Sequence, residues 1–78
     1  PNPFNPGCNI TFTLAQSSDI EISLFDISGK QVHFVRNRNL TKGGHSIYWE
    51  PNNIASGTYF VRLYDGQNSQ NIKVVFLK

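Results

Sequence analysis

Side chains able to perform acid–base or nucleophilic chemistry are few and scattered in this sequence. The acids and histidines are Asp19, Glu21, His33, Asp26, His45, Glu50 and Asp65. General acid–base catalysis needs two such groups held on either side of one substrate, yet neither histidine has a carboxylate pair close to it in sequence. The serines do not form a nucleophile elbow. The sequence therefore predicts no catalytic residues, and we expect the chain not to be an enzyme.

The sequence gives equally little support for a metal site or a catalytic cysteine. His33 and His45 are too far apart to form a local ligand pair, and the stretch 65–68 lacks the acidic spacing of a calcium loop, so a hairpin turn is expected there. Cys8 is the single cysteine and excludes an internal disulfide. We expect it to be small and half-buried, with a reactive or intermolecular thiol as the alternative. No metal and no cofactor are predicted.

Composition and charge narrow the class of protein. The chain has 78 residues, a net charge of +2, 15% charged and 13% aromatic residues, and no methionine. The cations are spread along the chain, whereas nucleic-acid binders concentrate them, so we expect no nucleic-acid partner. No apolar run approaches the roughly 20 residues that span a membrane. The length of 78 residues predicts a single domain over residues 1–78. Because the first residue is not methionine, we expect this domain to be excised from a longer polypeptide.

Short alternating runs rich in aromatic and β-branched residues are typical of strands, and Gly, Pro, Asn and Ser separate them. The expected strands are 9–14, 19–27, 31–36, 45–50, 58–64 and 70–77. A shift of phase at Phe25 and Ile27 predicts a bulge or a strand end. Val32 and Phe34 are expected on one face, and residues 37–44 form a polar connection. The pattern predicts an all-β fold, a small antiparallel Ig-like β-sandwich of about six to seven strands.

The strand 58–64 carries apolar residues on both of its faces. Tyr59, Val61 and Leu63 would enter the core. The residues expected on outward faces with aromatic or cationic character are Tyr48, Phe60, Arg62 and Tyr64. Such a surface could stack on sugar rings or dock a protein, unless another strand or loop covers it. This alternative ligand surface would make the chain a carbohydrate-binding or adhesive accessory module of a secreted enzyme.

The order of motifs resembles a known family. The motifs are Pro-Asn-Pro-Phe-Asn-Pro at the start, Asp26-Ile-Ser-Gly29-Lys30, Gly44 with Trp49, Ile54-Ala-Ser-Gly57-Thr-Tyr59-Phe-Val-Arg62-Leu, Lys73 and Lys78. Together they resemble the type A C-terminal sorting domain of the type IX secretion system, the Por secretion tail of Bacteroidetes. The chain is also similar to the Ig-like domain of the flagellar hook-capping protein, which would imply a structural assembly module.

The resemblance implies a C-terminal signal that directs an N-terminal cargo, through the periplasm and outer membrane, to the cell surface or exterior. Its implied partners are the outer-membrane translocon and a sortase-like peptidase. The implied recognition residues are Pro1, Pro3, Gly29, Lys30, Gly57, Tyr59, Lys73 and Lys78. On this interpretation Gly57 avoids a steric clash and lets Tyr59 enter the core. The prolines insulate the sandwich from the cargo, Phe4 pins them to one end of the core, and the lysines lie exposed.

Overall fold

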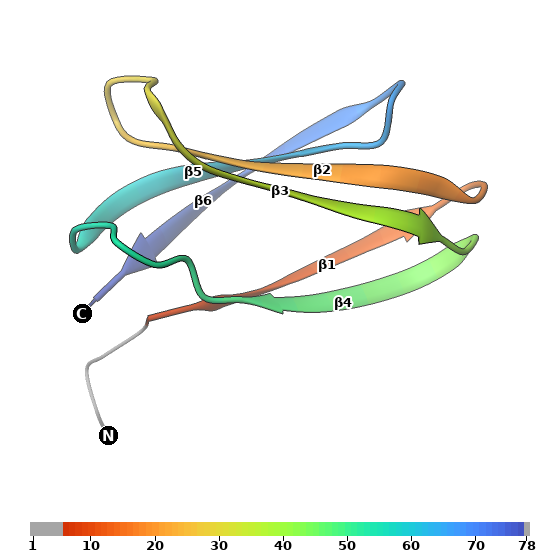
Figure 1. Ribbon diagram of the computed structural model, residues 1–78, viewed down its shortest axis with the longest axis horizontal. Helices are drawn as coiled ribbons and strands as arrows, with labels where there is room; N and C mark the ends of the chain where they lie inside the picture. Colours follow the sequence, from red (N-terminus) through yellow and green to blue (C-terminus); the bar gives the residue numbers. More distant parts are fainter. Residues whose placement is uncertain (1–5, 78) are drawn as a thin grey trace.

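The chain folds into two antiparallel β-sheets that face each other across one core. The computed structural model describes residues 6–77, and the predicted features at Pro1, Pro3, Phe4 and Lys78 lie outside them. β1 (Cys8–Leu14) pairs with β4 (Gly43–Trp49), and the second sheet has the order β3 (Gln31–Leu40), β2 (Ser18–Phe25), β5 (Gly57–Tyr64), β6 (Ser69–Phe76) (Figure 1). The predicted all-β antiparallel sandwich is confirmed.

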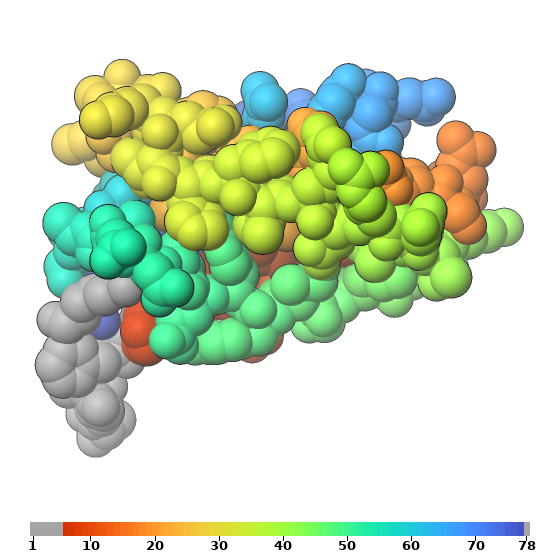
Figure 2. Space-filling model, viewed as in Figure 1, coloured from red at the N-terminus to blue at the C-terminus, as the bar shows by residue number. Residues whose placement is uncertain are grey.

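The core lies between the sheets because successive side chains of a strand point to opposite faces. Its buried residues are Ile10, Phe12, Leu14, Ile20, Ile22, Leu24, Trp49, Tyr59, Val61, Leu63 and Phe76. The predicted inner row of β5, Tyr59, Val61 and Leu63, is confirmed. Figure 2 shows β3 lying against β4 on one side of the molecule, where the His33 and Trp49 rings are 5.3 Å apart. This contact joins an edge of the large sheet to the small sheet.

The predicted change of phase at Phe25 is confirmed, but its consequence for β3 was not anticipated. Phe25 pairs with Gln31 and Leu24 pairs with His33, so β3 carries one extra residue, Val32, at a β-bulge. Because of the extra residue, the side chains of β3 from His33 onward point to the faces opposite to those expected from alternation that starts at Gln31. Phe34 consequently lies on the outer face and is 44% exposed. The prediction that Val32 and Phe34 share a face is therefore wrong.

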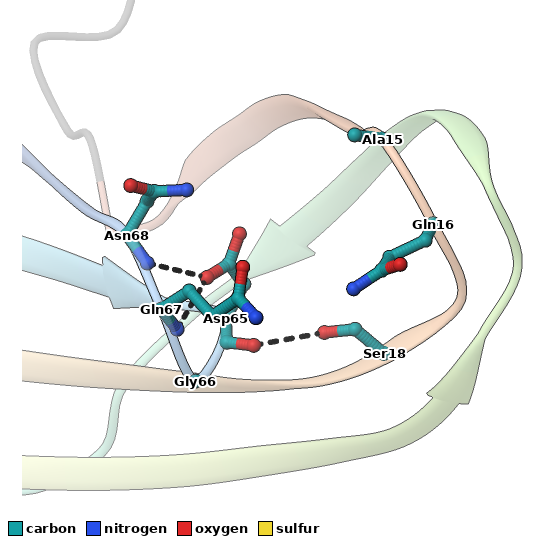
Figure 3. A pocket seen from close by; sticks show the side chains of 7 residues that line it. All are labelled: Ala15, Gln16, Ser18, Asp65, Gly66, Gln67 and Asn68. Carbon is teal, nitrogen blue, oxygen red and sulfur yellow. Dashed lines mark hydrogen bonds between the residues drawn. The ribbon is translucent and has the colours of Figure 1, made fainter.

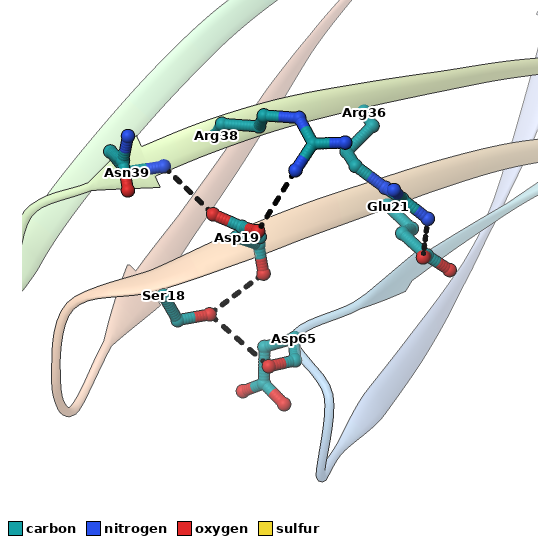
Figure 4. A network of polar contacts seen from close by, with 7 residues as sticks. All are labelled: Ser18, Asp19, Glu21, Arg36, Arg38, Asn39 and Asp65. Carbon is teal, nitrogen blue, oxygen red and sulfur yellow. Dashed lines mark hydrogen bonds and ion pairs between the residues drawn. The ribbon is translucent and has the colours of Figure 1, made fainter.

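The predicted polar connection at residues 37–44 is also wrong, because β3 continues to Leu40 and only residues 41 and 42 separate it from β4. Polar contacts hold this extension to β2 (Figure 4). The Asn39 N–H donates to Asp19 Oδ1 at 2.9 Å, and Arg38 approaches Asp19 Oδ2 at 3.8 Å. Arg36 and Glu21 form an ion pair at 2.7 Å. An edge strand held by polar side chains lacks the apolar alternation by which sequence patterns identify strands.

Candidate functional site

Three of the family motifs, which are far apart in the sequence, lie toward one end of the sandwich: the stretches 26–30 and 54–63 and Lys73 on β6. A hollow of about 280 Å³ is lined by Asp26 and Ile27 of the β2–β3 turn and by residues 56–59 at the start of β5. Phe25 pairs with Phe60, and Phe60 pairs with Lys73 on β6. The β2–β3 turn, the start of β5 and the end of β6 therefore lie at the same end (Figure 1).

The β2–β3 turn is built around one carboxylate. Asp26 Oδ1 accepts hydrogen bonds from Ser28 N at 2.9 Å, Ser28 Oγ at 2.6 Å and Lys30 N at 3.0 Å. Gly29 has φ +88°, which an L side chain rarely adopts, so this tight turn favours glycine at that position. Lys30 follows it and is exposed, as expected. The turn thus presents the lysine from a geometry fixed by Asp26 and Gly29.

Two aspartates of the turns are expected to make the fold sensitive to acid. The Ser28 hydroxyl and then the Lys30 N–H lower the pKa of Asp26, and the N–H groups of Asn68 and Gln67 lower the pKa of Asp65. A lowered folded-state pKa stabilises the fold above the ordinary value of about 3.9, and this stability is lost as pH falls through the folded pKa.

The double variant Asp26→Asn, Asp65→Asn keeps an accepting oxygen in each turn but cannot titrate. Urea unfolding between pH about 6 and 2 should show a smaller decrease in the free energy of unfolding for this variant than for the unmodified chain. Glu50→Gln, at an exposed carboxylate outside both turns, is a control for the loss of a titrating group elsewhere. Equal acid dependence in the unmodified chain and the aspartate variant would contradict the assignment.

At the start of β5, the predicted burial of Tyr59 is confirmed, but the predicted reason for Gly57 is wrong. A Cβ on Gly57 would meet only Tyr59 Cε1, at 3.8 Å, so the predicted steric clash is absent. The glycine is explained by its φ of +155°. Tyr59 does enter the core, and its hydroxyl donates to the Ala55 carbonyl at 2.6 Å. A tyrosine near the start of a strand that bonds backbone a few residues upstream is the tyrosine corner of Ig-like sandwiches.

The outer face of the four-stranded sheet holds three of the four residues of the alternative ligand surface. Phe60, Arg62 and Tyr64 alternate with the buried row of β5 and face outward together. Tyr48 is 59% exposed but belongs to β4, on the outer face of the opposite sheet. The predicted grouping of Tyr48 with the other three is therefore wrong. Which sheet a strand joins depends on pairing between distant segments, which alternation within one strand does not reveal.

Residues on other strands complete this outer face, which we call the Arg62 face. It is defined by Phe25, Phe34, Phe60, Arg62, Tyr64 and Lys73. Sequence reasoning did not assign Phe25 and Phe34 to it, because the bulge at Val32 hides the true phase of β3. The shift of phase at Phe25 was the available signal. Phe34 and Phe60 keep 44% and 41% of their surface exposed, so no other described element covers the face.

The polar groups around the β5–β6 turn bond to one another and to Ser18. A hollow of about 460 Å³ lies between the β1–β2 connection and the β5–β6 turn (Figure 3). There Ser18 Oγ donates to the Asp65 carbonyl at 3.1 Å, and Asp65 Oδ1 accepts from Gln67 N and Asn68 N. Asp65 thus forms the predicted hairpin turn. Within residues 6–77 no three His, Cys, Asp or Glu side chains gather as a metal site.

Cys8 packs against the edge of the core and is half-buried, as predicted. Burial raises the pKa of its thiol, which reduces the thiolate fraction available for reaction. The described residues also contain no helix long and apolar enough to cross a membrane.

These features define a small antiparallel β-sandwich that presents turns and side-chain surfaces for recognition. The family model for the secretion system C-terminal sorting domain matches residues 1–77, and the chain belongs to this family. It is a C-terminal sorting signal for type IX secretion, which marks proteins for export to the cell surface or outside. No curated protein and no solved structure matches the chain.

Membership in the family confirms the resemblance read from the motifs. A sorting domain acts as a signal and is in general not catalytic. It interacts with the type IX secretion machinery and is attached to an N-terminal cargo. The activity of that cargo is a property of other parts of the polypeptide.

Proposed function

We propose that the outer-membrane translocon recognises this domain as a folded sandwich, and that a sortase-like peptidase acts on it after export. In this proposal residues 1–78 form one sorting domain at the C-terminal side of a longer secreted protein. The observation that carries the proposal is the family match over residues 1–77. The fold supports it because three of the family motifs come from separate segments and come together only in the folded state.

The recognition residues divide into two kinds. Gly29, Gly57 and Tyr59 shape the backbone at one end of the sandwich and present little side-chain surface of their own. Lys30 and Lys73 are exposed and lie where a receptor can contact them. We assign the first group to setting the shape of this end of the sandwich, and the second group to direct contact with the receptor. No specific observation favours the carbohydrate-binding alternative, since Tyr48 lies apart from the other aromatic residues.

Export of a fused reporter tests the proposal. Residues 1–78 are placed at the C-terminus of a periplasm-directed reporter, in a host with type IX secretion and in a matched host that lacks the translocon. We expect the reporter at the surface or in the medium in the first host and in the periplasm in the second. Retention in the periplasm of the competent host would overturn the proposal.

Single lysine variants of the same fusion test direct contact. Lys30→Ala and Lys73→Ala are each expected to lower the exported fraction several-fold with an unchanged melting temperature, because exposed contacts contribute to recognition rather than to stability. Lys42→Ala, in the β3–β4 turn at residues 41–42, removes the same charge elsewhere and is the matched control. Export equal to that of the control would show that these lysines are not contacts.

A further inference from the structure

The Arg62 face carries two cations in a setting of exposed aromatic rings. The strand register places its residues in three adjacent rows across the sheet, the third of which holds Tyr64 beside Glu21 and Arg36. One row is Phe25, Phe60 and Lys73, and the next is Phe34, Ser23, Arg62 and Asn71. The face therefore spans all four strands of the sheet and combines charge with apolar surface.

Neighbouring rings hold Arg62 in place. Its Cζ lies 5.7 Å from the Phe25 ring centroid and 6.0 Å from that of Tyr64, which are cation–π distances. Ser23, next to Arg62 in the register, is only 2% exposed, so this part of the face is closely packed. A side chain already ordered in the free protein loses less conformational entropy when it binds.

The positive charge of the face is not neutralised. Arg36 is engaged by Glu21 at 2.7 Å. Among the described residues, no carboxylate forms an ion pair with Arg62 or Lys73; the ion pairs there involve Arg36 and Arg38 only. Charge complementarity therefore requires an occupant that carries negative charge beside apolar groups.

The number of charges distinguishes between anionic occupants. Stable attachment to an anionic lipid surface takes a cluster of about four to eight basic residues, and nucleic-acid binders gather many phosphate contacts. The Arg62 face offers two unpaired cations among aromatic rings. A second copy of the chain would bring the same two cations on its own face and repel. Arginine and tyrosine are instead enriched at the centres of protein interfaces.

We propose that the Arg62 face docks an acidic, partly apolar surface of a protein of the export machinery, with Arg62 at the centre of the contact. This inference rests on the proposed function and assigns it a second contact surface beyond the turn that presents Lys30. A carboxylate of the partner would lie against the Arg62 guanidinium while apolar side chains cover Phe34 and Phe60.

The reporter fusion tests this surface by charge reversal. Arg62→Glu is expected to lower the exported fraction about tenfold or more, since central interface residues dominate binding, and Lys73→Glu to lower it several-fold. Lys42→Glu makes the same change of charge in the β3–β4 turn and should leave export unchanged. Melting temperatures of the purified 78-residue variants identify any loss of folding. Lys73→Glu, at an exposed position on the edge strand β6, keeps the test valid if Arg62→Glu unfolds.

The outcomes separate this inference from the function on which it rests. If the unmodified fusion stays in the periplasm, the proposed function fails. If it is exported and both folded face variants are exported equally well, the docking surface is overturned together with the contact assigned to Lys73, while the sorting function itself stands. Two further results would overturn it: binding of the unmodified chain to phosphatidylglycerol vesicles that Arg62→Glu abolishes, and a sedimenting dimer that Arg62→Glu dissociates. The first would assign the face to a lipid surface and the second to self-association.

Discussion

Replacing Phe76 with alanine is expected to lower the free energy of unfolding by about 3–5 kcal/mol. Phe76 is fully buried, and its ring packs edge-on against Tyr59 at a centroid distance of 5.7 Å. Folded domains are stable by roughly 0.05–0.15 kcal/mol per residue, or about 4–12 kcal/mol for 78 residues. The loss is therefore comparable to the whole stability, and a large fraction of Phe76→Ala chains should be unfolded at growth temperature.

The adjacent residue provides the control for this prediction. Leu77 is 41% exposed, so Leu77→Ala removes a similar apolar side chain with much less loss of buried surface. Urea unfolding of the two variants should separate them by at least about 2 kcal/mol. The Phe76→Ala fusion should also fail in export, because the end of the sandwich that unites the β2–β3 turn with the start of β5 is not assembled. Equal unfolding midpoints for the two variants would show that the end of β6 does not hold the core.

Trp49→Ala is expected to cost about 3–5 kcal/mol for a different reason. Trp49 ends β4 and packs its ring against His33 of β3, which joins the small sheet to an edge of the large one. Removing the ring opens a cavity between the sheets. The small sheet consists of β1 and β4 alone, so we expect it to separate before the four-stranded sheet unfolds. Hydrogen exchange should show the β1 and β4 amides losing protection first.

Ser46→Ala on the exposed row of the same strand is the control, and surface changes of this kind usually stay within about 0.5 kcal/mol. Its exchange pattern should match that of the unmodified chain. Uniform loss of protection across both sheets in Trp49→Ala would mean that the sandwich unfolds as a single unit.

Alternation of apolar residues was sufficient to predict most of the fold. The inner rows of β1 and β5 follow a strict period of two, which places Phe12 and Val61 in the core. The end of β2 was visible because Phe25 breaks that period. In contrast, Phe34 looks in phase with Val32, and only pairing with β2 reveals the extra residue between them. The polar end of β3 has no apolar alternation at all, so its register is held by contacts such as Asn39 with Asp19.

The candidate site, too, could be predicted only where it depends on local sequence and not on strand pairing. Motif order predicted the family, because each motif is a local stretch of sequence. It did not predict that Tyr48 and Tyr64 lie on opposite outer faces, since each strand's choice of sheet depends on distant partners. Nor did it predict the Arg62 face, which is assembled from four strands that come together only through pairing.

The topology also orders folding in time. β2 with β3 and β5 with β6 are hairpins between neighbours, and hairpins form in roughly 1–10 μs. The pairs Glu21–Tyr64 and Cys8–Trp49 instead close long loops, and such non-local pairings are what slow a folding chain. The end that unites the β2–β3 turn with the start of β5 exists only after β2 and β5 have joined. A receptor that contacts this end therefore responds only to chains that have completed the slow step of folding.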